Sequence, residues 1–398
     1  MQTSPAARQR GRHRLIGSVA TLCAGMIVPM ALGTPSASAN PGRHRDADHS
    51  QPGFQVVASG LDNPRGIDVG PFGVLAVAEA GRGGSDCVPS IDPETGQPST
   101  ACLGLTGHVS LLWHGHKFVV GNFPSIATDA GASAAGPSGV SFSGLKLLVS
   151  EQLGTDPNPG FTTNLDSLDQ LGKVFSLSFG STKVLGDVAA FEVANNPDGN
   201  QIDSDVYGVV GKGKSAVATD AAGNSLVRIA PDGTVSLLAA FPPQMEPFPE
   251  GVPGGPPAGT PIPSESVPTS VTIGPDGAYY VGELTGFPFA VGSARVWRVV
   301  PGKAPTVFAS GFTNIIDLQF DSHGRLYVLE LAKNGLLAAN GPGGDDSGAL
   351  IRVDRNGSKS EIASAGLHLP GGVAVSGDQI FVTNHSTSAG IGEVLRIR

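Results

Sequence analysis

The sequence predicts an all-β fold, a six-bladed β-propeller with four-stranded blades, and three observations predict it. A strand–turn–strand pattern recurs six times between residues 53 and 398. The chain has 57 glycines among 398 residues and no long 3.6-residue periodicity, which is typical of a β protein with many turns. The last repeat also lacks a fourth strand, and a segment at the start of the predicted domain resembles the missing one.

Each repeat begins with two short strands joined by a tight turn, and the second strand ends in a polar residue. The six pairs are "PRGIDVGPFGVLAVAE", "PSGVSFSGLKLLVSE", "VYGVVGKGKSAVATD", "PTSVTIGPDGAYYVGE", "IIDLQFDSHGRLYVLE" and "PGGVAVSGDQIFVTN". A variable insert and a third strand follow, such as "ARVWRVV" or "GEVLRIR". Five repeats continue into a fourth strand, among them "TKVLGDVAAF" and "TVFASGF".

The sixth repeat ends at Arg398 without a fourth strand, whereas "GFQVVASGL" near residue 53 resembles the fourth strands and has no first three of its own. We therefore expect the N-terminal strand to complete the last blade and close the ring, which leaves no long exposed edge. An open β-solenoid is the alternative, but it gives no reason for the missing strand to reappear at the other end.

Residues 1–39 are predicted to be a secretory signal peptide, because "RQRGRHR" is basic, "LIGSVATLCAGMIVPMAL" is apolar and "ASA" provides a small-residue cleavage site. A membrane anchor is the alternative reading of the apolar stretch. We expect residues 40–52 to be a disordered leader, residues 53–398 to be one domain, and the mature protein to be secreted, monomeric and not integral to a membrane.

Residues 1–39 contain four arginines and no acidic residue, so their removal moves the formal net charge from −9 to −13. An acidic chain is poorly suited to nucleic acid, whose phosphates attract Lys and Arg. Cys87 and Cys102 remain after cleavage, and an even pair close in sequence in an exported protein predicts a disulfide.

The long inserts all belong to two kinds of connection, from second to third strand and from fourth strand to the next first strand. They cover residues 80–106, 121–137, 152–171, 192–205, 242–268, 284–293 and 331–348. In an antiparallel four-stranded blade these connections lie on one side, so we expect the functional site on this insert-bearing face.

The polar residues that end the second strands point at the same face. They are Glu79, Glu151, Asp220, Glu283, Glu330 and Asn384. Because we expect second strands to lie near the axis, a ring of oxygen ligands arises, and Ca²⁺ prefers such ligands. The more favoured interpretation is structural: these side chains hold one blade to the next, neutralised by backbone N–H groups of the next blade or by Arg65, Arg82 or Arg295.

Three further features belong to this face. "NNPDGNQIDSDVYG" offers Asp198, Asn200, Asp203 and Asp205 as oxygen ligands, although an Asx-rich turn is the more favoured interpretation. The insert at residues 242–268 is Pro-rich and is predicted to be an extended polyproline excursion. His385 is the one histidine that we single out as an acid or base, since His114 and His116 lie in a predicted turn on the opposite face.

The stretch "AVATDAAGNSLVRIAPDGTV" resembles an NHL-type propeller repeat. Together with "VVASGLDNPRGIDVGPFGVLAVAEAGRGG" and "PGGVAVSG", it makes the chain resemble the ScyD/ScyE family of secreted propeller proteins over nearly all of the predicted mature chain. The resemblance implies the propeller fold and secretion, but no reaction and no catalytic residue.

No nucleophile elbow, zinc-protease motif or P-loop occurs in the sequence. The sequence therefore favours a secreted binding protein with an unidentified small-molecule or extracellular partner. The alternative is a Ca²⁺-dependent hydrolase of the lactonase or gluconolactonase kind, and a weaker alternative is a quinone-dependent sugar dehydrogenase.

Overall fold

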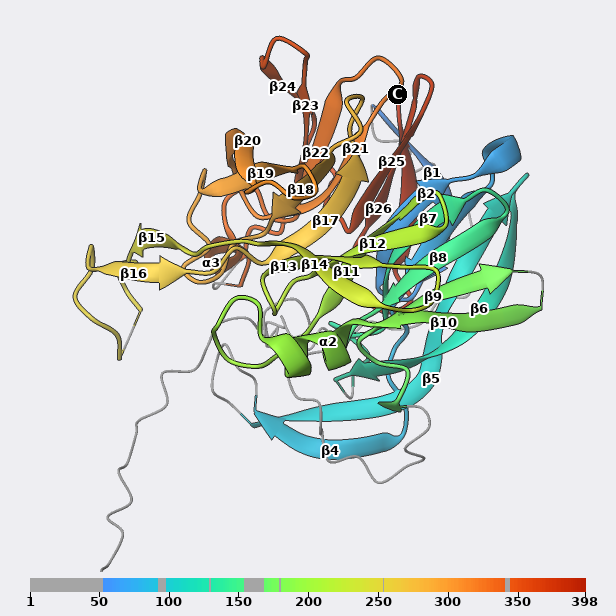
Figure 1. Ribbon diagram of the computed structural model, residues 1–398, viewed down its shortest axis with the longest axis horizontal. Helices are drawn as coiled ribbons and strands as arrows, with labels where there is room; N and C mark the ends of the chain where they lie inside the picture. Colours follow the sequence, from blue (N-terminus) through green and yellow to red (C-terminus); the bar gives the residue numbers. More distant parts are fainter. Residues whose placement is uncertain are drawn as a thin grey trace, which may run out of the picture.

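The computed structural model describes residues 53–91, 98–128, 130–153, 168–178, 180–252, 254–340 and 344–398. The predicted signal peptide and leader lie outside the described residues. Antiparallel sheets of four or five strands dominate the described part, as the sequence predicts (Figure 1). No helix in these ranges combines the length and the apolar character that crossing a membrane requires.

The sheets follow one another along the chain. The first contains β2 (Pro64–Val69), β3 (Leu75–Glu79), β5 (Pro98–Trp113) and β4 (Asp86–Ile91), with β6 (His116–Ala127) also paired to β5. The second contains β7 (Pro137–Ser143), β8 (Lys146–Glu151), β9 (Lys173–Ser178) and β10 (Ser181–Asp187). The third contains β11 (Val206–Lys212), β12 (Ser215–Asp220), β13 (Ser225–Ile229) and β14 (Val235–Ala240).

The second half of the chain repeats the pattern. Its first sheet contains β17 (Pro268–Ile273), β18 (Tyr279–Glu283), β19 (Ala294–Val299) and β20 (Thr306–Phe312). The next contains β21 (Ile315–Phe320), β22 (Leu326–Glu330), β23 (Ala349–Val353) and β24 (Lys359–Ala363). The last contains β25 (Gly372–Ser376), β26 (Gln379–Asn384), β27 (Gly392–Ile397) and, from the other end of the domain, β1 (Phe54–Leu61).

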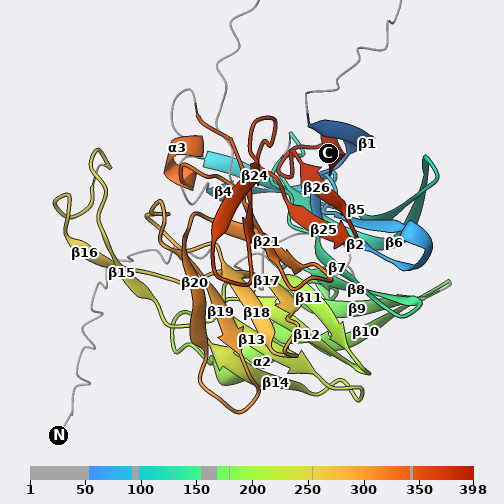
Figure 2. The same ribbon diagram turned by 90° about the horizontal axis from the view of Figure 1, so that it is seen from above.

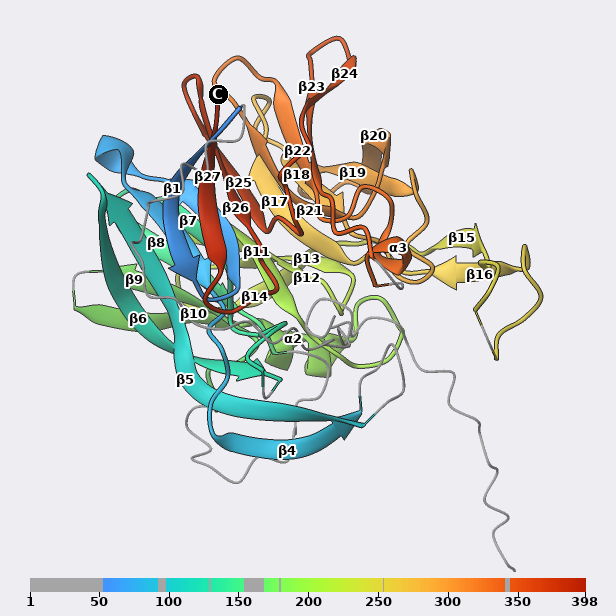
Figure 3. The same cartoon turned by 180° about the vertical axis from the view of Figure 1, so that it is seen from behind.

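The pairing of β1 with β27 joins residues that are more than 300 positions apart, with Val56 opposite Leu395 and Ala58 opposite Val394 (Figure 3). The first strands of the sheets contact one another in a cyclic order: β2 with β7, β7 with β11, β11 with β17, β17 with β21, β21 with β25, and β25 with β2. They surround the middle of the molecule in the view from above (Figure 2).

The core consists of apolar layers between neighbouring sheets. For example, Leu148 and Val174 of the second sheet pack with Val209, Ala218 and Val227 of the third. Each strand alternates its side chains between two faces, so a sheet can contribute to the layers on both of its sides. The sheets are therefore held together by burial on both faces.

Three expectations about local structure are wrong. The fourth strand "TKVLGDVAAF" ends at Asp187, because Asp187 caps α2 (Val188–Asn195) by accepting the N–H of Ala190 at 2.9 Å. The Pro-rich insert contains a hairpin of β15 (Gln244–Pro247) and β16 (Pro261–Ser264) rather than only polyproline backbone. First strands, not second strands, line the central cavity, whose volume is about 360 Å³.

The insert after β3 is more ordered than a simple loop. It forms β4 and the first half of β5, which extend below the other sheets in Figure 1. Cys87 and Cys102 lie opposite each other in this ribbon and form the predicted disulfide. A short helix, α3 (Leu336–Asn340), lies in another insert.

Candidate functional site

The six polar residues that end the second strands are all buried, and five of them bind the segment that enters their own sheet. Backbone N–H groups of this segment donate to Glu79, Asp220, Glu330 and Asn384, and the Ser266 hydroxyl donates to Glu283. The donor–acceptor distances are 2.7 or 2.8 Å. The sequence predicts that these side chains bind the next blade, but each of the five instead fixes the entry of its own first strand against the second strand. Their role is structural, as expected, but it lies within one sheet.

These side chains do not share one site. Within the described residues, no three His, Cys, Asp or Glu side chains lie close enough together to hold a metal ion. The reason is that the first strands line the central cavity, so the second strands, which carry these side chains, lie farther from it. The use of the ring as a Ca²⁺ site remains a prediction that this arrangement does not favour.

Glu151 is the exception among the six. It is fully buried, and neither carboxylate oxygen accepts a hydrogen bond. Its sheet begins at Pro137, and the N–H two residues earlier, of Ala135, donates to Ile126 O of β6 at 2.7 Å. β6 thus accepts the Ala135 N–H, whereas in most of the other sheets the N–H before the first strand donates to the polar residue that ends the second strand. Burial raises the pKa of Glu151 well above its usual range.

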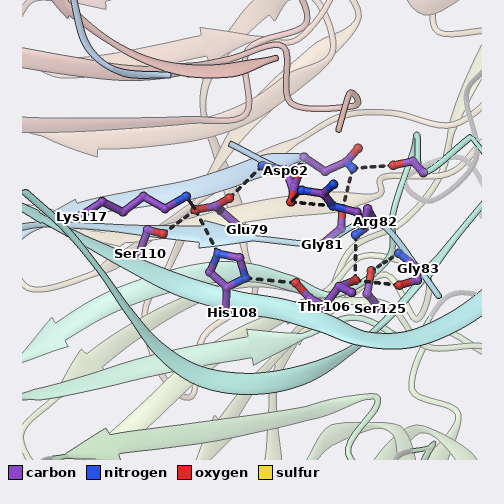
Figure 4. A network of polar contacts seen from close by, with 12 residues as sticks. Asp62, Glu79, Gly81, Arg82, Gly83, Thr106, His108, Ser110, Lys117 and Ser125 are labelled. Atoms are coloured by element: carbon purple, nitrogen blue, oxygen red, sulfur yellow. Dashed lines mark hydrogen bonds and ion pairs between the residues drawn. The ribbon is translucent and has the colours of Figure 1, made fainter. Parts of the chain in front are cut away.

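Glu79 has the opposite surroundings (Figure 4). Lys117 Nζ lies 3.1 Å and His108 Nε2 3.2 Å from Glu79 Oε1, and the Ser110 hydroxyl donates to the same oxygen. Burial alone raises the pKa of Glu79, but hydrogen bonds from His108, Ser110 and the Asp62 N–H outweigh it and lower the pKa to about 2. Glu79 is therefore ionised and compensated.

The arginines that the sequence offers as neutralising groups have different partners. Arg295 neutralises one of the six polar residues, Glu283, with Nη2 at 3.1 Å from Oε2, and Trp297 Nε1 donates to the same oxygen at 2.8 Å. Arg82 instead pairs with Asp62, and Arg65 donates to Ala134 O at 3.0 Å. Of these three arginines, Arg295 alone neutralises one of the six polar residues.

A second group of carboxylates lies around the end of β12, between α2 and the segment before β17. We call it the acid pocket, and it consists of Glu192, Asp198, Asp203, Asp220 and Glu265. Glu192, Asp203 and Asp220 are at most 5% exposed, whereas Asp198 and Glu265 are half-buried. In the described part of the chain, no Lys, Arg or His forms an ion pair with any of the five.

Glu192 occupies the inner end of the acid pocket. It is 1% exposed, and neither of its carboxylate oxygens has a hydrogen-bond partner. A methyl group placed on Gly223 would lie 2.7 Å from Glu192 Oε2 and 3.2 Å from Asp220 Cγ, so the two carboxylates flank this glycine. A buried carboxylate without a donor is costly, and such a group calls for an explanation.

The electrostatics of the acid pocket follow from this crowding. Burial raises the pKa of Glu192 to about 8, and Asp220, Asp198 and Asp203 add to the effect. Burial also raises the pKa of Asp203 to about 7, with Glu265 as the leading charged neighbour. Like charges that share a site disfavour ionisation, so a bound cation would lower both pKa values.

The outer part of the acid pocket is tied together by an amide. Asn224 Nδ2 donates to Asp198 Oδ2 at 3.0 Å, and Asn224 Oδ1 accepts the N–H of Val267 at 3.0 Å. Glu265 keeps Oε2 without a hydrogen-bond partner. The half-buried Asp198 and Glu265 therefore form the solvent side of a site whose inner side is Glu192 and Asp220.

The sequence identified part of this group. Asp198 and Asp203 belong to the Asx-rich segment singled out as a second candidate, and its Asn200 and Asp205 serve local and neighbouring contacts. Glu192 and Glu265 were missed because Glu192 was assigned to the start of an insert that follows a strand, and Glu265 to a polyproline segment. The Asp187 cap, an Asp followed by an apolar run, was the available signal for a helix that carries Glu192.

His385 lies against His368, with parallel rings whose centroids are 5.3 Å apart. His368 Nδ1 is 2.9 Å from Asp346 Oδ1. Burial and the neighbouring His368 lower the pKa of His385. His385 is thus neutral at pH 7, and the carboxylate-oriented imidazole is that of His368.

The central cavity contains two further carboxylates. Asp68 accepts the Phe142 N–H at 2.7 Å and Asp317 accepts the Val373 N–H at 2.8 Å, so each links its first strand to the next one. Burial raises the pKa of Asp68 to about 6 and that of Asp317 to about 7. Both side chains are explained by these links between sheets.

No protein-family model matches the chain, and no curated protein matches it. Solved structures with a similar arrangement include a streptogramin B lyase, with a TM-score of 0.42 and 12% identity over 87% of this chain and 98% of that one. A putative oxidoreductase (glucose dehydrogenase) from Thermus thermophilus has a TM-score of 0.46 and 15% identity, covering 87% of this chain and 99% of that one.

A putative gluconolactonase is also similar, with a TM-score of 0.39 and 13% identity over 66% of this chain and 78% of that one. These similarities are too low to transfer an activity or a residue role. The function therefore has to be inferred from the residues of this chain.

Proposed function

We infer that the sheets form a six-bladed β-propeller closed by β1. The cyclic contacts between first strands and the hydrogen bonds of β1 to β27 support this reading. Because the strands of each blade alternate in direction, the long inserts lie on one face of such a propeller, and the acid pocket belongs to that face because Asp220 ends a second strand.

We propose that the protein is a binding protein of the propeller type, and that its insert-bearing face takes a positively charged ligand in the acid pocket. The observation that carries this proposal is Glu192, a buried carboxylate that has no donor and whose charged neighbours are acids. A positive charge placed there supplies the missing donor and removes the repulsion.

Export from the cell belongs to the same proposal. The N-terminal pattern of residues 1–39 supports it, and so does the Cys87–Cys102 disulfide, since disulfides persist in oxidising compartments. The resemblance to the ScyD/ScyE family is consistent with it, because that family is secreted.

Calorimetry and thermal melting of residues 40–398 test the proposal at pH 8.5 and constant ionic strength, with calcium chloride, magnesium chloride and putrescine as probes. We expect at least one cation to bind and raise Tm, and Glu192→Gln to reduce that shift. Asp378→Asn, an exposed turn position between β25 and β26, is the control and should respond like the parent. If no probe binds the parent protein, the proposal is wrong.

The hydrolase alternative has one observation in its favour. The Asp346–His368 pair has the form of an imidazole oriented by a carboxylate, which is how general bases are often held. A screen of lactone substrates with the parent protein and with His368→Ala tests it. Activity that is lost in the variant would favour chemistry at this pair over binding alone.

A further inference from the structure

The acid pocket also restricts what kind of cation it takes, and this inference rests on the proposed function. Its carboxylates are spread out rather than gathered around one point. Glu192 has Asp220, Asp198 and Asp203 as charged neighbours, and Glu265 has Asp198 and Asp203. The negative charge therefore extends from the buried Glu192 to the half-buried Glu265.

A bare metal ion suits this distribution poorly. Ca²⁺ requires six to eight oxygen atoms at about 2.3–2.6 Å from one centre. No three of the five acid-pocket side chains, all of which are described, converge in that way. Asp220 is also occupied, because it accepts from the Ser204 hydroxyl at 2.7 Å and from the N–H groups of Asp205 and Gly223 at 2.7 and 3.1 Å.

An ammonium group suits it well. It carries three donors that bind separate acceptors at hydrogen-bond distance, and it tolerates acceptors that already hold other donors. Glu192 offers two buried oxygens without donors at one end, and Glu265 offers Oε2 at the other. Because Glu192 at one end and Glu265 at the other each have oxygens without donors, a ligand with two positive groups would satisfy both.

We propose that the acid pocket binds an aliphatic diamine or polyamine, with one ammonium group between Glu192 and Asp220 beside Gly223 and a second between Asp198 and Glu265. The alkyl chain between the two groups spans from the inner to the outer carboxylates. The solvent side, formed by half-buried side chains, is the entry.

Titration calorimetry with putrescine, butylamine and calcium chloride at pH 8.5 tests this assignment on residues 40–398. We expect putrescine to bind at least tenfold more tightly than butylamine, because the second ammonium group adds a charge-assisted hydrogen bond. Glu192→Gln and Glu265→Gln should each weaken putrescine binding at least tenfold, whereas Asp378→Asn should leave it unchanged.

Gly223→Ala tests position separately from charge, because its methyl group would crowd the Glu192 and Asp220 carboxylates at 2.7 and 3.2 Å without removing either of them. We expect it to weaken putrescine binding at least tenfold, with urea unfolding and circular dichroism confirming that the variant folds. If it does not fold, Glu192→Gln and Glu265→Gln decide the outcome.

The outcomes are distinguishable. Calcium binding without putrescine binding would overturn the diamine and leave the proposed function standing. Equal affinities for putrescine and butylamine would overturn two-point recognition. Absence of binding by all three probes would overturn the diamine together with the acid pocket as a cation site.

Discussion

Glu79 and Glu192 are both buried glutamates, yet their surroundings are opposite. Glu79 lies near Lys117 and His108 and accepts hydrogen bonds from Ser110 and the Asp62 N–H, so its pKa is lowered to about 2. Glu192 has no hydrogen-bond partner, and its charged neighbours are acids. Burial, reinforced by these acids, therefore raises its pKa to about 8. Burial is shared, and the donors make the difference.

The presence of hydrogen-bond donors distinguishes the buried acids that are structural. A buried carboxylate that receives donors stabilises the fold, while one that receives none destabilises the empty protein and is satisfied by something from outside or by a proton. Repetition in the sequence points to the first kind, because the entry segment of a blade offers its donor in nearly every repeat. Apart from Asp220, the residues of the acid pocket lie on inserts that do not repeat.

The largest effect is expected at Glu79. Glu79→Gln leaves Lys117 and several donors without a carboxylate, and we expect the free energy of unfolding at pH 7 to fall by about 3–4 kcal/mol. Because the folded pKa of Glu79 lies below its usual value of 4.5, this stabilisation is present above pH 4.5 and disappears as the pH falls to about 2. Urea unfolding at pH 7 and pH 3 measures both.

The control for Glu79 is Glu361→Gln, an exposed position on β24. A loss at Glu79 no larger than that of the control would show that the surrounding donors are satisfied by water and that the contrast with Glu192 is wrong.

The disulfide ranks second. Cys102 lies on β5, the strand that also carries His108 and Ser110, so the double variant Cys87→Ala with Cys102→Ala tests the Glu79 surroundings selectively. The bond links residues 15 positions apart, and loops of this size contribute about 2–3 kcal/mol. We expect this loss in urea unfolding with no change in putrescine affinity; a matching loss of affinity would contradict the separation of the two regions.

Glu192→Gln is expected to have a smaller effect of opposite sign. The raised pKa means that stability falls as the pH rises from about 4.5 to about 8, because only the folded state retains the proton in that range. The variant removes this dependence, and we expect a gain of about 1 kcal/mol at pH 8.5 without ligand, or about 2–4 °C in Tm. A variant that is less stable than the parent at pH 8.5 would mean that Glu192 has a donor after all.

Glu151→Gln should have the smallest effect. Burial raises the pKa of Glu151 well above its usual range and so favours the uncharged carboxyl, which a neutral amide of the same shape replaces. We expect a change within about 0.5 kcal/mol in urea unfolding. A loss as large as that of Glu283→Gln, which deprives Arg295 of its partner, would reveal an ionised Glu151 with an internal cation.

Much of the fold was predictable because it repeats. Alternating apolar residues and tight turns located the first and second strands of each sheet, and "GFQVVASGL" was predicted correctly to pair at the far end of the chain. The failures fall where a short segment supports two periods. "VAAFEVAN" alternates well enough for a strand, but the Asp187 cap makes it a helix.

The site was less predictable than the fold. Asp198 and Asp203 were visible as a local cluster, and Arg295 was anticipated as a neutralising group, although its partner Glu283 was not. Glu192 and Glu265 lie on two unrelated inserts more than 70 positions apart, so no spacing in the sequence links them. Nor does any pattern show that β6 takes the N–H of Ala135 and leaves Glu151 without a donor.

The sequence by itself determined the strands, their turns, the cysteine pair and the acid that ends five of the second strands, because each depends on side chains close together along the chain. The tertiary structure decided which of those acids receive donors and which remain without them. That outcome depends on where neighbouring blades and inserts place their N–H groups and cations, and electrostatic compensation in a buried site is set by distances in space.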